Sequence, residues 1–283
     1  MASLHRHIDL CNDAATLAGM VRLRIGTATV GWLAADVARR LRALQDAFLA
    51  DEEGLTLVAG DGVTARSAAL GKVAAHLETA GLVSSRREPF DVRAVPGGEV
   101  LARLDRGALS PLGIISEGAH VNGCVRRPDG LHLWVGWRSK DKGVAPGKLD
   151  NLVAGGIPAG LSPVQTLLKE AAEEASMPPG LAARARQVSR VSYRMVDAPG
   201  IRRDVLHCFD LDVPEDFTPQ PSDNEVEQFE LWPAERLLRT VLETSDVKFN
   251  VNLVLIDLFL REGLVDPTSD EGRRLRAGLD PGP

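Results

Sequence analysis

The stretch of sequence that decides the fold runs over residues 155–177 and reads Gly155-Gly156-Ile157-Pro158-Ala159-Gly160-Leu161-Ser162-Pro163-Val164-Gln165-Thr166-Leu167-Leu168-Lys169-Glu170-Ala171-Ala172-Glu173-Glu174-Ala175-Ser176-Met177. In it a glycine-rich loop enters a helix, which we predict over residues 163–175. Ser162 suits the N-cap, where its hydroxyl can accept a hydrogen bond from a free amide, and Pro163 suits the first helical position, which needs no amide hydrogen. The loop glycines let the backbone approach a ligand closely. We therefore expect a ligand site where the loop meets the helix.

The predicted helix has an apolar and an acidic face. Three glutamates, Glu170, Glu173 and Glu174, are neighbours, because residues three and four apart on a helix lie side by side. At about 100° per residue the apolar side chains gather on another stripe, which we expect to pack against a sheet. That stripe consists of Val164, Leu168, Ala171, Ala172 and Ala175.

Neighbouring carboxylates next to a glycine-rich loop favour a metal site. Like charges at this spacing weaken a helix by roughly 0.2–0.5 kcal/mol per pair, and only Lys169 is close enough to offset them. Magnesium prefers oxygen ligands and is commonly held by a few carboxylates together with substrate phosphates. A glutamate-rich face is also typical of a solvated surface, but the loop directly before this helix favours the metal site.

The segment Lys169-Glu170-Ala171-Ala172-Glu173-Glu174 resembles the R-E-U-x-E-E core of the Nudix box, G-x5-E-x7-R-E-U-x-E-E-x-G-U, in which U is a bulky aliphatic residue. The resemblance implies a hydrolase that uses Mg²⁺, with Mn²⁺ as an alternative, to drive attack of water on a diphosphate. It implies Glu170 and Glu174 as the principal metal ligands, with Glu173 assisting. A carboxylate from a distant loop often completes such a site in this family, and Glu225 or Glu227 is the candidate.

Three positions depart from the general pattern. Leu161 stands where the loop glutamate is expected when counting from Gly155, Ser176 replaces the later glycine, and Lys169 replaces the arginine. Lysine supplies the positive charge of arginine without its planar fork.

These departures resemble one subfamily, the thiamine-pyrophosphokinase-like Nudix hydrolases with an N-terminal extension. The flanking text carries the same resemblance: Lys148-Leu149-Asp150-Asn151-Leu152-Val153-Ala154-Gly155-Gly156, Asp223-Asn224-Glu225-Val226-Glu227-Gln228-Phe229 and Lys248-Phe249-Asn250. It implies that thiamine diphosphate, or an oxidised analogue of it, is hydrolysed to the monophosphate. Gly155, Gly156 and Lys148 are then expected to bind the substrate, although a single loop lysine is also typical of a solvent-exposed position.

Two other functions remain open. One is a hydrolase of nucleoside diphosphate derivatives such as ADP-ribose. The other is a Nudix-like module that binds a ligand without catalysis. Leu161 and Lys169 are compatible with such a module, whereas the three glutamates argue for an enzyme.

Composition and charge describe an ordinary globular protein. The 283 residues are 44% hydrophobic and 25% charged, and the net charge of −6 predicts no surface for nucleic acid. No apolar run reaches the roughly 18 to 20 residues that cross a bilayer, and the N-terminus lacks the apolar core of a signal peptide. Three widely spaced cysteines, Cys11, Cys124 and Cys208, fit reduced thiols in a cytoplasmic protein. The oligomeric state is left open.

The chain is predicted to hold two domains, with a boundary near residue 112. Residues 1–112 are expected to form a smaller, helix-rich α+β domain, with one helical face over residues 33–48, a strand at 55–59 and a helix at 66–80. Residues 113–265 are expected to form the Nudix hydrolase domain, an α/β/α sandwich with a mixed sheet, and residues 266–283 a loose tail. In the second domain we predict strands at 119–125, 131–137, 188–195, 205–211 and 227–232, and further helices at 234–242 and 250–261.

Overall fold

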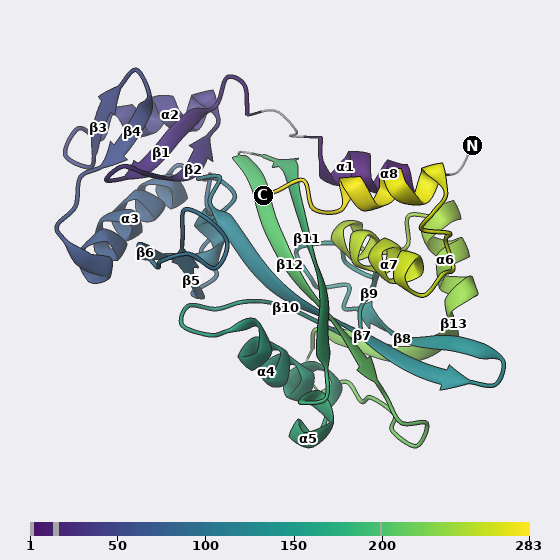
Figure 1. The fold of residues 1–283 in the computed structure, drawn as a ribbon. Helices are drawn as coiled ribbons and strands as arrows, with labels where there is room; N and C mark the ends of the chain where they lie inside the picture. Colours follow the sequence, from purple (N-terminus) through teal and green to yellow (C-terminus); the bar gives the residue numbers. More distant parts are fainter. Residues whose placement is uncertain (1–2, 14–16, 199, 223) are drawn as a thin grey trace.

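The computed structural model describes residues 3–13, 17–198, 200–222 and 224–283. It contains a smaller N-terminal unit and a larger unit built on a long mixed sheet (Figure 1). The N-terminal unit has a four-stranded sheet in the order β2-β1-β4-β3 and a separate hairpin, β5-β6. Its elements are β1 (Val21–Ile25), β2 (Ala28–Leu33), α2 (Ala35–Arg42), β3 (Phe48–Asp51), β4 (Gly54–Leu57), α3 (Gly62–Thr79), β5 (Pro89–Val92), β6 (Ala102–Asp105) and the 3₁₀ turn η1 (Arg106–Ala108).

The expectation of a helix-rich N-terminal region is wrong in part. Of the helical face predicted over residues 33–48, only α2 is helical, because Leu33 ends strand β2 and Phe48 begins strand β3. Leu33 and Phe48 continue the three- and four-residue spacing of the buried positions of α2. The sequence alone therefore does not distinguish these strand residues from residues of the helix. The predicted strand at 55–59 and helix at 66–80 correspond to β4 and α3.

The larger unit confirms the mixed sheet covered by helices on both faces. Its strands run in the order β11-β12-β7-β8-β13, with β10 paired to β7 and β9 to β8, and only β12 and β7 are parallel neighbours within it. All five predicted strands lie inside observed ones. The strands are β7 (Ile115–Arg127), β8 (Gly130–Arg138), β9 (Leu149–Asp150), β10 (Val153–Gly156), β11 (Arg186–Asp197), β12 (Gly200–Asp212) and β13 (Val226–Pro233).

The helices of this unit form two layers, each with its own apolar core. Helices α4 (Pro163–Ala175) and α5 (Pro179–Ala182) cover one face of the sheet (Figure 1). The other face is covered by α1 (His5–Cys11), α6 (Ala234–Glu243), α7 (Phe249–Arg261) and α8 (Asp270–Gly278). Helix α1 thus joins the larger unit although it begins the chain, while the boundary near residue 112 stays a prediction. No helix in the described ranges has the length and apolar character needed to cross a bilayer.

The prediction of a loose tail over residues 266–283 is wrong. Ser269 caps helix α8 by accepting a hydrogen bond from the Gly272 amide at 3.0 Å, and Leu275 and Leu279 are buried in the core. Arg276 pairs with the buried carboxylate of Asp257. The prediction relied on the charged composition of this segment and overlooked the two leucines that bury it against the core.

Candidate active site

Local capping interactions fix the two ends of helix α4. Ser162 and Gln165 form a reciprocal capping box, in which the Gln165 amide donates to Ser162 Oγ at 3.2 Å and the Ser162 amide donates to Gln165 Oε1 at 2.9 Å. The C-cap is Ser176, with a left-handed φ of 52°. Left-handed C-caps favour glycine, which explains why the general box has glycine there. The helix therefore begins and ends where the sequence predicts.

The buried face of α4 differs from the predicted stripe. Ala171 and Ala175 are buried as expected, but Val164 is 50% exposed and Ala172 is exposed. The prediction assumed that every glutamate faces away from the core. Instead Glu174 is only 5% exposed, because its carboxylate turns inward and accepts a hydrogen bond from the Ala154 amide at 3.0 Å.

The three glutamates of the helix occupy three different environments. Glu174 is buried against β10, and Glu170 is mostly buried beside Gly155, where an added Cβ would lie 2.6 Å from Glu170 Cδ. Glu173 is half exposed. Burial raises the pKa of Glu174 well above its ordinary value, and the charges of Asp150, Glu170 and Glu225 raise it further against the Ala154 hydrogen bond.

Glu225 is the distant carboxylate that the fold brings to this cluster. Its charge raises the pKa of both Glu170 and Glu174, although burial is the larger cause in each case. It precedes β13 and forms an ion pair with Lys142. The other candidate, Glu227, instead accepts a hydrogen bond from the Lys140 amide at 3.2 Å.

Sequence reasoning missed Asp150 as a neighbour of the cluster. Its buried carboxylate pairs with Arg138 at 2.6 Å and with Lys248 at 3.1 Å, and its charge raises the pKa of Glu174. Arg138 also donates to the carbonyls of Val144 and Ala145, so this pair holds the loop that follows β8. The available signal was an aspartate a few residues before the glycine pair.

Lys169 lies between two of the glutamates. Its ammonium contacts Glu170 Oε1 at 3.0 Å and Glu173 Oε2 at 2.6 Å, and these carboxylates raise the pKa of Lys169 although burial opposes them. Within the described part of the chain, no three His, Cys, Asp or Glu side chains already converge as a metal site. The donor chemistry still fits a hard divalent cation, because Glu170, Glu174 and Glu225 repel one another in a partly buried setting that a cation would relieve.

The predicted substrate-binding residues lie in two places. Gly155 lies against Glu170, and Gly156 lies against the N-terminal unit, since an added Cβ would be 2.6 Å from the Phe90 ring. Lys148 instead donates a hydrogen bond to the carbonyl of Ser245, which lies in the loop before α7. The fold therefore brings Gly155 against Glu170, whereas Gly156 faces the N-terminal unit and Lys148 bonds to a carbonyl elsewhere.

Two family models match the chain: a domain of unknown function, DUF4743, over residues 3–116 and the NUDIX domain over residues 117–253. Nudix hydrolase 24, chloroplastic, of Arabidopsis thaliana is 36% identical over 280 residues, covering 96% of this chain and 77% of that protein. The chain belongs to the Nudix hydrolase family. Nudix hydrolase 20, chloroplastic, of the same plant is 35% identical over 274 residues, covering 93% of this chain and 73% of that protein.

Among solved structures, a protein from Deinococcus radiodurans is 21% identical to this Nudix hydrolase, with a TM-score of 0.46. The match covers 59% of this chain and 97% of that chain. Family membership confirms the expected Nudix fold with an N-terminal domain before it, and the expected class of enzyme, a diphosphate hydrolase. Nudix hydrolases generally use divalent metals such as Mg²⁺. The thiamine-related subfamily, the identity of the metal and the roles of single residues stay predictions.

Proposed function

We propose that this Nudix hydrolase uses Mg²⁺ to cleave the diphosphate linkage of a small organic diphosphate, namely thiamine diphosphate or its oxidised analogues, and releases the monophosphate. The observation that carries the proposal is the burial of Glu170 and Glu174 beside the glycine loop, where burial and the charge of Glu225 raise the pKa of both carboxyls. The choice of thiamine compounds is supported only by the resemblance of the box and its flanking segments to the thiamine-pyrophosphokinase-like members.

Each residue of the cluster has a role in this proposal. Glu170 and Glu174 hold the cation with help from Glu173, and Glu225 completes the set. When bound, magnesium or manganese would offset the charge of the diphosphate and make water a competent nucleophile at neutral pH. Lys169 positions the Glu170 carboxylate through their 3.0 Å contact.

The loop residues complete the proposed substrate site. Gly155 and Gly156 are proposed to bind the substrate through their backbone, and their lack of a Cβ lets Glu170 and Phe90 pack directly against the loop. Lys148 would have to give up its hydrogen bond to the Ser245 carbonyl before it could reach a phosphate. The cytoplasmic location expected from the sequence stays a prediction, and both plant relatives are named chloroplastic.

Substitution of the buried glutamate tests the proposal. Glu174→Gln keeps the shape of the side chain and removes a metal-binding charge, so we expect Mg²⁺-dependent turnover to fall by about 100-fold or more, since even residues that only support metal ligands cost roughly 10- to 100-fold. The substrates to compare are thiamine diphosphate, oxythiamine diphosphate and ADP-ribose, with products separated by chromatography. Glu243→Gln, at an exposed position on α6, is the matched control.

Each outcome of this experiment is informative. Turnover that survives Glu174→Gln, or that needs no divalent metal, would contradict the proposed site. Faster cleavage of ADP-ribose than of the thiamine compounds would replace the substrate class and leave the site standing. Metal binding without turnover on any substrate would identify a non-catalytic module.

A further inference from the structure

The N-terminal unit contacts the loop that leads into helix α4. The carbonyl of Pro89 accepts a hydrogen bond from the Ala159 amide at 2.8 Å, and Asp91 Oδ2 accepts one from the Gly160 amide at 3.2 Å. The Phe90 ring fills the space beside Gly156. Strand β5 therefore lies along the glycine-rich side of the candidate active site.

The segment just before β5 contacts the loop between β8 and β9. A Cβ added to Gly143 would lie 3.5 Å from Nη2 of Arg86. Gly143 belongs to the loop between β8 and β9, next to Lys142, which forms an ion pair with Glu225. Residues 86–91 thus extend from the loop that carries Lys142 to the glycine loop, so one side of the site is built by the N-terminal unit.

Arg86 has no carboxylate partner among the residues that the structure describes, and the same is true of Arg87 and Lys140. What sets Arg86 apart is its guanidinium, which lies against Gly143 in the loop that carries Lys142. The nearby arginines of the hairpin are paired: Arg93 and Arg103 with Asp91 at 2.9 and 3.2 Å, and Arg106 with Glu88 at 3.0 Å. Four cations of the Nudix domain near the glutamates are paired as well. These are Lys142, Lys169, Arg138 and Lys248.

The turn that carries Arg86 is held in place by Asp105. The Asp105 carboxylate accepts hydrogen bonds from the Arg86 amide at 2.9 Å and from Ser85 Oγ at 3.1 Å. These and other backbone donors lower the pKa of Asp105, although its partial burial opposes them. Arg87 adopts a φ of 55°, a left-handed conformation that costs a non-glycine residue about 1 kcal/mol or more.

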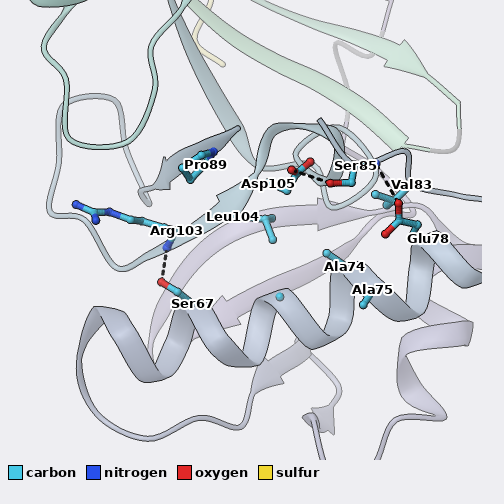
Figure 2. A pocket seen from close by; sticks show the side chains of 11 residues that line it. Ser67, Ala74, Ala75, Glu78, Val83, Ser85, Pro89, Arg103, Leu104 and Asp105 are labelled. Atoms are coloured by element: carbon cyan, nitrogen blue, oxygen red, sulfur yellow. Dashed lines mark hydrogen bonds between the residues drawn. The ribbon is translucent and has the colours of Figure 1, made fainter. Parts of the chain in front are cut away.

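Figure 2 shows this turn beside α3, where Ser85 bonds to Asp105 and to the carboxylate of Glu78. A cavity of about 300 Å³ lies between α3 and β6 at the same place. Small residues of α3 line one side of it, and the charged residues Glu78, Arg103 and Asp105 that also line it already have partners within the protein. The turn is therefore anchored from both α3 and β6, and the Arg86 backbone is fixed before any ligand binds.

We propose that Arg86 is a substrate-binding residue that binds the phosphate groups of the diphosphate. One function of the N-terminal domain is then to supply this arginine to the active site. The inference rests on the proposed function of the Nudix site. A guanidinium forms two parallel hydrogen bonds to a phosphate, which a paired lysine beside the glutamates does not offer. A local cation is needed because the net charge of −6 repels an anionic substrate at long range.

Three single variants of the full-length protein test the assignment. Arg86→Met should raise KM for the best diphosphate substrate by roughly 10- to 100-fold, as expected for the loss of a charge-assisted pair, and should leave kcat within about threefold. Arg86→Lys should recover part of the affinity. Arg39→Met, at an exposed position on α2, should behave as wild type. Affinity for methylenediphosphonate with Mg²⁺, an uncleavable probe, and the melting temperature are measured alongside.

The outcomes separate this proposal from the function on which it rests. An Arg86→Met enzyme with KM and probe affinity within twofold of wild type would overturn the assignment of Arg86 and leave the hydrolase standing. A joint fall of kcat and melting temperature at unchanged probe affinity would also overturn it, because Arg86 would then only support the loop around Gly143. Wild-type protein that binds the probe through Arg86 but cleaves no diphosphate would overturn the proposed function alone. If wild type neither binds the probe nor turns over, both fail.

Discussion

Substitution of Gly155 by alanine should displace the Glu170 carboxylate. The new Cβ would lie 2.6 Å from both Cγ and Cδ of Glu170 and 3.0 Å from Oε2. Ordinary contacts between such atoms are about 3.5–4.0 Å, so the side chain has to move by roughly 1 Å. Gly155 is not in the left-handed region, and therefore the backbone itself is not strained.

A shift of this size matters more for activity than for stability. Metal ligands tolerate displacements of only about 0.2 Å, and a 1 Å misplacement of a catalytic group costs about 100-fold in rate. We therefore expect the kcat of Gly155→Ala to fall by about that factor. The free energy of unfolding should change by less than about 1 kcal/mol, because a long, flexible side chain absorbs the clash.

The measurement is Mg²⁺-dependent product formation, combined with urea denaturation of the same preparations. Gly180→Ala is the matched control, since an added Cβ there has no neighbour within 4 Å. A Gly155→Ala enzyme with wild-type kcat and an unchanged Mg²⁺ requirement would show that Glu170 does not act where we place it. A large loss of stability would instead show that the clash falls on the backbone.

Three further predictions concern other parts of the molecule. Lys169→Ala should lower kcat about tenfold because Glu170 loses its positioning contact, whereas Lys169→Arg should stay within a few-fold; equal kinetics of the two would contradict this role. Burial, aided by Lys248, lowers the pKa of His120 from 6.5 to about 4. The free energy of unfolding should therefore fall by about 3 kcal/mol as the pH drops from 6.5 to 4. In urea titrations, the unfolding free energy of His120→Gln should depend less on pH than that of the wild type. Leu275→Ala should cost about 2–4 kcal/mol of unfolding free energy, and a loss no larger than that of the exposed control Arg274→Ala would mean that α8 is dispensable.

The parts of the fold that could be predicted are those stabilised by nearby residues. Helix α4 matches its predicted bounds because Ser162, Pro163 and Gln165 act within one turn of its start. Five strands of the mixed sheet were predicted because apolar runs between turn residues are visible in a short window, whereas the short strands β9 and β10 were not predicted. The strand pair β1-β2 was missed although it is a tight hairpin in which Ile25 pairs with Ala28. Helix α8 was missed because its few apolar residues pack against distant segments of the chain.

For the candidate site, too, the features that depend on nearby residues were predictable and those that depend on distant residues were not. The spacing of Glu170, Glu173 and Glu174 identified them as candidates, since helical periodicity is a local property. Their environments were not predictable, because the burial of Glu174 depends on an amide 20 residues earlier in the chain. The choice between Glu225 and Glu227 depended on how the loop before β13 meets the loop after β8.

The sequence by itself determined the loop and helix that carry the acidic residues, and the class of chemistry that this set favours. Only the tertiary structure decided which carboxylates are buried together and that the N-terminal unit places Arg86 against Gly143 in the loop after β8. The physical reason is one of range. Capping and helical periodicity act over a few residues, whereas burial and the interaction of charges depend on which distant segments pack around the same point.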